Sequence, residues 1–336
     1  MQTERVYCPV LSVNPSSICT FSDLVSGPRP SRQLETYKEN FKKNQHNDKI
    51  SKIAAKKISL ALDYIIYVAR PKTIPAGYKG AGNQYKLAFV TLSLSAKQIH
   101  TDKEIITNCL QPLLNYFRKH YKLENYVWRA EKQKNGNIHF HIVLDKWIPY
   151  QDLRLHWNLY QQNLGYITRY SEAQKQFHNK GFKLHKSMLK TWSVDRQKKA
   201  YDKGYKENWN NPNSIDIHST KRIRNLKKYL CKYLTKQTHE KINEDEINNS
   251  TVSGLLSIDS RLWACSEQLS NLRGARSDID FDTFNEIERI RSTKGVKTII
   301  SDYFTVTFIE LKQLNEIEFP IITKLFREYI ELKFPT

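Results

Sequence analysis

Apolar and polar positions alternate in the middle of the chain, and this pattern predicts two adjacent β-strands. In the runs Asn125–Gln133 and Ile138–Lys146, the even-numbered positions are mostly apolar, while several odd-numbered positions carry polar groups. A period of two is typical of a strand that buries one face. Asn135-Gly136 lies between the runs and favours a tight turn. The segment is therefore predicted to be a β-hairpin.

The segments around this hairpin alternate between strand-like and helix-like patterns. Lys86–Leu94 is apolar and β-branched, Asp102–His120 has helical spacing behind Thr101 as an N-cap, and Tyr150–Asn163 is again helical. The order is strand, helix, strand, strand, helix. It predicts a sheet layered against helices.

The N-terminal part of the chain follows other patterns. Residues 1–33 are rich in Ser and Pro and show no sustained period, so they are expected to form an extended arm with little structure. Residues 34–82 are expected to form a basic helical segment up to Ala69 and then a glycine-containing loop. No Gly-Lys-Ser/Thr follows in this loop, so neither a P-loop nor an attached ATP-driven helicase is expected.

Two further regions complete the expected domain organisation. Residues 83–240 are expected to form the main domain, and residues 241–336 a small α+β unit. In that unit Phe281–Arg291 and Phe319–Leu332 have helical spacing, and Val296–Ile309 is strand-like.

The apolar faces of the two hairpin strands set their register. A two-residue Asn-Gly turn would pair odd positions with even ones and bury a polar face. A three-residue loop, with Gly136 as the left-handed residue of a bulge, keeps both apolar faces together. This register sets Glu131 directly opposite His139.

Glu131, His139 and His141 then converge on one polar face of the hairpin. Two neutral imidazoles and a carboxylate suit a divalent cation, Mg²⁺ or Mn²⁺, that keeps open positions for phosphate oxygens. Gln133 lies on the same face and is a reserve ligand. The alternative is that His139 and His141 reflect ordinary strand alternation. Glu131 in register favours the metal site.

A second motif is the repeat Tyr-x-x-Lys at Tyr229–Lys232 and Tyr233–Lys236, within a predicted helix from about Lys221 to Gln237. Residues four apart share a helix face, so both hydroxyls can point at one place. Tyrosine is a poor nucleophile unless positive charge or a metal-bound electrophile assists it. The lysines are assigned to phosphate and phenolate stabilisation. Alternatively, both tyrosines are core residues beside leucines of the same helix: Leu226, Leu230 and Leu234.

The remaining histidines lack such a pattern, and surface or core packing is the better interpretation for His156, His178 and His185. His218, in the run Asp216-Ile217-His218, is the one that most needs structural inspection.

Composition points to a polyanionic partner. The chain has 54 Lys+Arg against 34 Asp+Glu, a net charge of +20. Residues 241–336 hold 12 basic and 16 acidic residues, a net of −4, so the first 240 residues carry +24. Nucleic acid is therefore the leading partner, and its binding surface is expected in the N-terminal part.

The cysteines and the hydropathy pattern bear on the compartment. Five cysteines without paired C-x-x-C spacing indicate neither a disulfide framework nor a zinc ribbon. No apolar run approaches a membrane span, and the N-terminus lacks a signal-peptide pattern. A cytoplasmic protein that does not bind membranes is expected.

Three motifs together resemble a known family. Phe89–Ser93, then Glu131 with His139 and His141, then Tyr229–Tyr233 occur in the order of the three motifs of HUH endonucleases that initiate rolling-circle replication. The paired tyrosines are similar to the microvirus type of initiator, found in small single-stranded DNA phages and in related prophage or plasmid elements. The resemblance covers about Lys86 to Gln237. Arg261-Leu-Trp263 with Ser266 is similar to a further part of the subfamily pattern.

The resemblance implies an α+β fold with a central antiparallel sheet that carries the metal ligands on adjacent strands. It implies a nickase and strand transferase in which a tyrosine forms a 5′-phosphotyrosine on single-stranded origin DNA. The expected partners are then that DNA and the polymerase and helicase of a bacterial host. Two alternatives remain: an HUH transposase or relaxase, and a non-catalytic nucleic-acid-binding protein, for which charge and aromatic residues would suffice.

Overall fold

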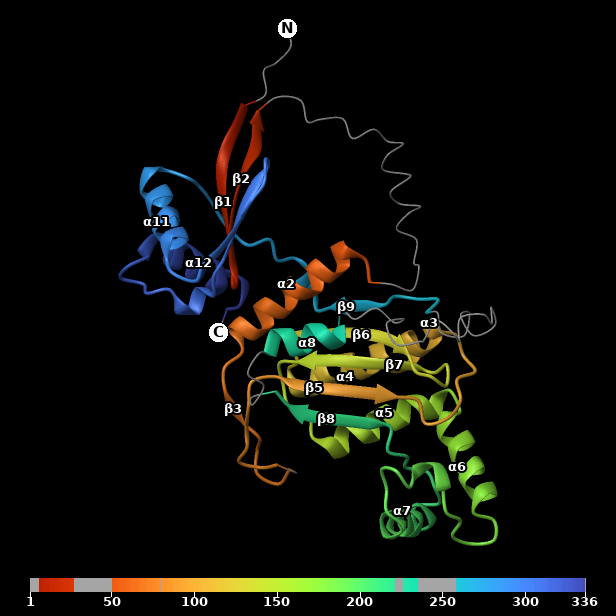
Figure 1. Cartoon of the computed structure of the whole chain (residues 1–336). Helices are drawn as coiled ribbons and strands as arrows, with labels where there is room; N and C mark the ends of the chain where they lie inside the picture. The colour runs from red at the N-terminus through yellow and green to blue at the C-terminus, as the bar shows by residue number, and fades with distance from the viewer. Residues whose placement is uncertain (1–5, 27–49, 79, 221–225, 235–257, 336) are drawn as a thin grey trace, which may run out of the picture. The chain divides into compact units, whose positions relative to one another are not determined.

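The computed structural model describes residues 6–26, 50–78, 80–220, 226–234 and 258–335 (Figure 1). It divides into two compact units. One contains the described residues 6–26, 51–69 and 266–335, and the other contains residues 70–265 apart from the gaps above, with Ile50. We call them the terminal unit and the central unit. Both are α+β with antiparallel sheets packed against helices, as expected.

The central unit is built on a five-stranded antiparallel sheet in the order β8-β5-β7-β6-β9. The elements come in the expected order of strand, helix, strand, strand, helix, although a π-helical turn interrupts the first helix. The elements are β3 (Lys72–Thr73), β4 (Gln84–Tyr85), β5 (Ala88–Ser93), α3 (Asp102–Ile105), η1 (Ile106–Leu110), α4 (Gln111–Tyr121), β6 (Tyr126–Lys132), β7 (Ile138–Leu144), α5 (Tyr150–Asn163), α6 (Tyr166–Phe177), η2 (Lys186–Met188), α7 (Val194–Lys206), β8 (Ile215–Ser219), α8 (Leu226–Leu234) and β9 (Trp263–Cys265).

The predicted hairpin register is confirmed. Strands β6 and β7 pair with Glu131 opposite His139, and Gln133 N donates to Asn137 O at 2.9 Å, which leaves a three-residue loop. Gly136 has a φ of 81°, the left-handed conformation that glycine adopts without a steric penalty. Even positions of the hairpin therefore all lie on one face. That face packs against α5, where the ring of Trp157 meets that of Phe140 edge-on at 6.2 Å.

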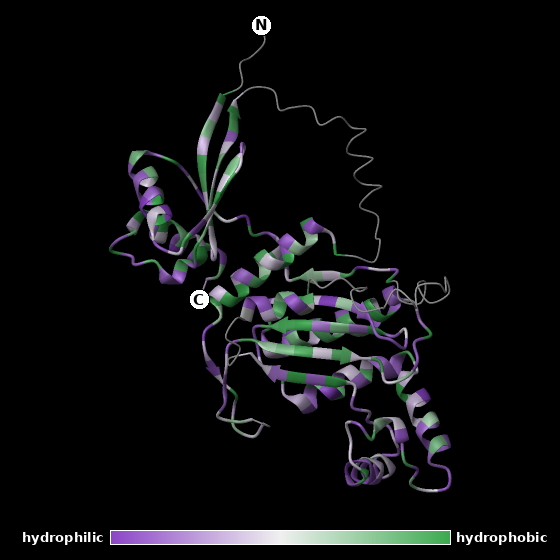
Figure 2. Cartoon of the chain, viewed as in Figure 1, coloured by the Kyte–Doolittle hydropathy of each residue, from purple (hydrophilic) through white to green (hydrophobic). Residues whose placement is uncertain are grey.

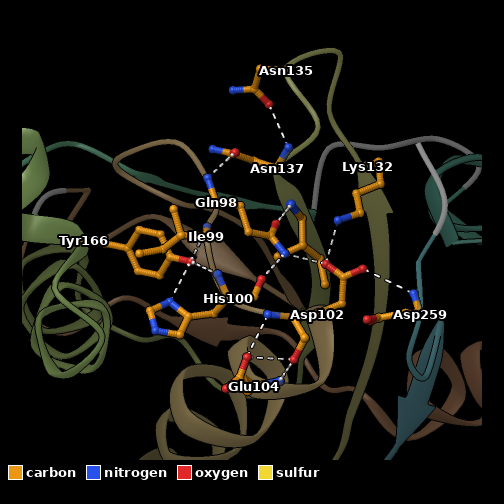
Figure 3. A network of polar contacts seen from close by, with 12 residues as sticks. Gln98, Ile99, His100, Asp102, Glu104, Lys132, Asn135, Asn137, Tyr166 and Asp259 are labelled. Carbon is orange, nitrogen blue, oxygen red and sulfur yellow. Dashed lines mark hydrogen bonds and ion pairs between the residues drawn. The ribbon is translucent and has the colours of Figure 1, made fainter. Parts of the chain in front are cut away.

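A polar network ties the turn end of the hairpin to the segment that precedes α3 (Figure 3). Asp102 is 3% exposed and accepts from Lys132 Nζ at 2.7 Å and from Gln98 Nε2 at 2.7 Å. Gln98 Oε1 also accepts from Ile138 N at 2.6 Å. Lys132 follows Glu131 and Ile138 precedes His139, so this network holds the strand ends that carry the polar face.

We expect Asp102→Asn to lower the free energy of unfolding of the central unit by about 3–5 kcal/mol, because it leaves the ammonium of Lys132 buried without its counter-charge. Urea denaturation checks this value. Glu172→Gln, an exposed carboxylate in the same unit, serves as the control and should change little. A loss below about 1 kcal/mol for the Asp102 variant would show that the ion pair does not stabilise the strand ends.

Residues 165–212 form an excursion between α5 and β8 that we call the basic lobe. Its folded state rests on aromatic stacking, with His178 parallel to Trp209 at 5.1 Å and Phe177 stacked on His185 at 4.0 Å. The lobe has 11 basic and 4 acidic residues, a net of +7, and all 11 basic side chains are exposed. Figure 2 shows α7 coloured mainly as hydrophilic.

The terminal unit contains a second five-stranded antiparallel sheet, in the order β10-β1-β2-β12-β11. Glu286 is buried and its carboxylate accepts from Ile321 N and Ile322 N, the first backbone amides of the last helix. The elements are β1 (Val6–Asn14), β2 (Ser17–Ser26), α2 (Lys52–Val68), α10 (Glu267–Ser270), β10 (Ala275–Asp278), α11 (Phe281–Ser292), β11 (Lys297–Ile300), β12 (Phe304–Phe308), η4 (Leu311–Gln313) and α12 (Pro320–Lys333).

The expectation of an arm with little structure is wrong for residues 6–26. They form the hairpin β1–β2, in which Leu11, Val13 and Ile18 are buried. Strand β2 pairs with β12, with Ile18 opposite Thr307. The sequence pattern missed these strands because their partners lie near the other end of the chain. The C-terminal region is α+β as expected, although its strand-like segment 296–309 is a hairpin of two short strands.

In the parts of the chain that the structure describes, none of the helices combines the length and the apolar character that crossing a membrane requires.

Candidate metal centre and tyrosine helix

The odd-numbered face of the central sheet is organised in rows that run across the strands. The first row is Glu131–His139–Ser93, the second is Arg129–His141–Thr91–Asp216, and the third is Val127–Val143–Phe89–His218. Polar side chains thus occupy the two rows toward the turn of the hairpin, and the third row is mainly apolar. This division follows from the period of two, because each strand places every second residue on this face.

Glu131, His139 and His141 form a cluster that could hold a metal ion; we call it the Glu-His-His cluster. One possible ligand atom from each residue lies within 4.8 Å of the others. Glu131 Oε1 lies 2.9 Å from His141 Nε2. Adjacent ligands of an octahedral ion with bonds of about 2.1 Å lie about 3 Å apart, so this pair has the spacing of two neighbouring ligands.

The electrostatics of the cluster also suit metal binding. Burial lowers the pKa of His139 to about 4, with a further lowering by His141. The ring is therefore neutral near pH 7, which is the form that coordinates metals. Burial alone would raise the pKa of Glu131, but the hydrogen bond and charge of His141, together with Arg129 and His139, hold it below its ordinary value. The cluster thus offers two nitrogen lone pairs and one negative charge.

Side chains on β5 and β6 orient both imidazoles. Ser93 Oγ lies 2.9 Å from His139 Nδ1, and Thr91 Oγ1 lies 3.4 Å from His141 Nδ1. When Nδ1–H donates to a hydroxyl, Nε2 carries the lone pair for a metal. Gln133, the reserve ligand of the sequence analysis, places its amide 3.0 Å from His139 Nδ1. In this structure Gln133 contacts a candidate ligand and is outside the Glu-His-His cluster.

Ser93→Ala should therefore weaken Mn²⁺ binding by about 10–100-fold, because His139 loses the acceptor that fixes its tautomer. Titration of the purified protein with Mn²⁺, followed by electron paramagnetic resonance of the free ion, measures this change without reference to activity. Ser187→Ala, an exposed serine of the basic lobe, is the matched control. Equal affinities for the Ser93 variant and the wild type would contradict the orienting role.

Helix α8 contacts β7 and lies on the face that carries the cluster. Its Leu230 and Leu234 are fully buried. Tyr229 is half-buried, and its ring meets that of Phe89 at 5.9 Å. Its hydroxyl lies 3.1 Å from His218 Nε2, on strand β8. The leucines supply the buried side of the helix, and the hydroxyl of Tyr229 has a polar partner.

The other predicted residues of this helix are described only in part. Tyr233 belongs to α8, but its side chain lies outside the described residues, as does all of Lys236. Lys232 is on α8 with an exposed side chain. Convergence of the two tyrosines therefore stays a prediction.

Phe89 lies between the Glu-His-His cluster and Tyr229. Its ring stacks on His141 at 5.6 Å and contacts the ring of His218 at 5.2 Å. Sequence analysis quoted Phe89 only as part of a motif, and it marked His218 only for inspection. The signal available in the sequence was the alternation in Asp216-Ile217-His218, which is typical of a strand. Its place beside β5 depends on pairing across the whole basic lobe.

Comparison with known proteins gives one match. Residues 87–238 match a family of replication-associated proteins, described by the name ORF2, and this region contains the Glu-His-His cluster and helix α8. The match supports a role in replication. No curated protein sequence and no solved structure matches the chain.

Proposed function

We propose that this protein is a metal-dependent nickase and strand transferase that initiates rolling-circle replication on single-stranded origin DNA. The observation that carries the proposal is the placement of the Glu-His-His cluster and Tyr229 on one face of the central sheet. The match to a replication-associated family supports the process in which this chemistry is used.

Glu131, His139 and His141 are proposed to hold Mg²⁺ or Mn²⁺. Nitrogen donors favour Mn²⁺ in affinity, since Mg²⁺ prefers oxygen ligands. When bound, the ion supplies Lewis-acid polarisation of the scissile phosphate. Ser93 and Thr91 keep the two imidazoles in the ligating orientation. Phe89 excludes water beneath His141, since it is 2% exposed and stacks on that ring.

Tyr229 and Tyr233 are proposed as alternating nucleophiles of the microvirus type. One phenolate oxygen bonds to phosphorus and displaces the 3′-oxygen, which leaves a 5′-phosphotyrosine and a 3′-hydroxyl for a host polymerase. After one round of synthesis the other tyrosine attacks the regenerated origin. The released 3′-hydroxyl then rejoins the strand held on the first tyrosine. Lys232 and Lys236 are proposed to stabilise phosphate and phenolate charge.

The basic lobe is proposed to bind the DNA backbone. Its 11 exposed cations fold next to the sheet domain through α5 and β8, and its net charge of +7 favours phosphate contacts. Because this chain has no P-loop, strand separation is assigned to a host helicase. A bacterial cytoplasm is the proposed location.

The proposal is tested by incubating the purified protein with circular single-stranded DNA that carries the replicon's origin, with Mn²⁺ or with EDTA. A protein–DNA adduct that resists denaturing gel electrophoresis is expected only with the metal. The 5′-end of the nicked strand should be blocked and its 3′-end should prime a polymerase. Binding without any adduct would instead identify a non-catalytic nucleic-acid-binding protein. Joining to unrelated DNA would identify a transposase.

A further inference from the structure

His218 contacts the atom of Tyr229 that would attack phosphorus. Its Nε2 lies 3.1 Å from the tyrosine hydroxyl, within hydrogen-bonding range. The two residues come from different elements, β8 and α8. An imidazole at this distance from a nucleophilic hydroxyl is the arrangement that a general base requires.

Asp216 sets the imidazole in the orientation that accepts a proton. Its Oδ2 lies 3.4 Å from His218 Nδ1, two residues earlier on the same face of β8. With Nδ1–H directed at this carboxylate, the neutral ring carries its lone pair on Nε2, facing the hydroxyl of Tyr229. Asp216 also stabilises the imidazolium once the proton has moved. It acts through His218 and is a positioning residue.

The surroundings leave a path for the proton. The side chain of His218 is 39% exposed, so an imidazolium there can exchange its proton with solvent. The ring of Phe89 forms the floor under both His218 and Tyr229, and on its other side it stacks on His141. The proton acceptor and the Glu-His-His cluster therefore flank one aromatic ring, which separates proton transfer from metal coordination.

We propose that His218 is the general base that deprotonates Tyr229 during strand cleavage, positioned by Asp216. This inference rests on the proposed function. As the bond from the Tyr229 oxygen to phosphorus forms, its proton passes to His218 Nε2. The bond from phosphorus to the 3′-oxygen breaks, and that oxygen takes a proton from solvent. In the reverse reaction the 3′-hydroxyl attacks the phosphotyrosine, and the imidazolium returns a proton to the departing phenolate.

The first test measures the single-turnover rate of adduct formation on a single-site oligonucleotide in a Tyr233→Phe background, so that Tyr229 alone reacts. His218→Ala and His218→Gln are compared with His120→Ala, an exposed histidine on α4. Glutamine can still accept a hydrogen bond from the tyrosine but cannot take its proton. We expect both His218 variants to be slower by about 10²–10⁴-fold and the control to be unchanged. A wild-type rate in His218→Gln would reduce the role of His218 to positioning and would overturn the proposal.

The second test places 2,3,5-trifluorotyrosine at position 229. This phenol is already ionised near neutral pH and needs no base. We expect it to restore adduct formation in His218→Ala by at least tenfold, while it gives little gain when His218 is present. If it fails to restore the rate, His218 acts through structure, and the proposal is overturned.

These outcomes are distinguishable from failure of the proposed function. The proposed function fails if the protein with both tyrosines and His218 forms no adduct. If that protein forms an adduct only through Tyr233, nicking stands and the assignment of His218 to Tyr229 is overturned.

Discussion

His139→Ala and His141→Ala are expected to lower the rate of nicking by about 10³-fold each while most DNA binding remains. Lewis-acid stabilisation is worth several kcal/mol, and each 1.36 kcal/mol is a factor of about ten in rate. Binding should persist because it rests mainly on Lys and Arg contacts to phosphates, and the basic lobe offers 11 such side chains.

Three measurements check this prediction: gel-based cleavage rates, Mn²⁺ affinity, and DNA affinity at fixed salt. His120→Ala is the control, because its exposed ring lies on α4, outside the Glu-His-His cluster. Thermal melting establishes that each variant is folded. Undiminished nicking by either variant would remove the metal assignment.

Replacement of both tyrosines, Tyr229→Phe with Tyr233→Phe, is expected to abolish the covalent adduct, since a phenyl ring cannot attack phosphorus. Each single variant should retain some adduct formation on a single-site oligonucleotide, because the other hydroxyl remains. Release of unit-length circles needs alternation of the two nucleophiles and should fail in both single variants. We expect Tyr229 to make the first cleavage, because its hydroxyl contacts His218.

Mass spectrometry of the DNA-linked peptide identifies the nucleophile in the wild type and in each single variant. Tyr205→Phe, an exposed tyrosine of the basic lobe, is the control and should leave every step unchanged. An adduct that survives in the double variant, or one that maps elsewhere, would show that helix α8 is structural and that the nucleophile is another residue.

Local sequence patterns were sufficient for the metal face. The period of two in β6 and β7, together with Gly136 in the turn, leaves one register that keeps both apolar faces buried. That register alone sets Glu131 opposite His139. Similarly, Tyr150–Asn163 was assigned from helical spacing and is observed as α5 with the same bounds. In these elements the decisive interactions are between residues close in sequence.

Only the tertiary structure decided which distant segments became neighbours. Strand β8 follows the 48-residue basic lobe, and its pairing with β5 brings His218 beside Phe89 and toward Tyr229. In the same way, strands β1 and β2 depend on β10 and β12, near the other end of the chain, and no local pattern predicted them. A strand's period records which face is buried, but the identity of the neighbouring strand is set by packing of the whole sheet. The sequence by itself therefore determined the charge, the hairpin and the candidate metal ligands. The tertiary structure supplied the proton acceptor for Tyr229 and joined the chain's two ends in one sheet.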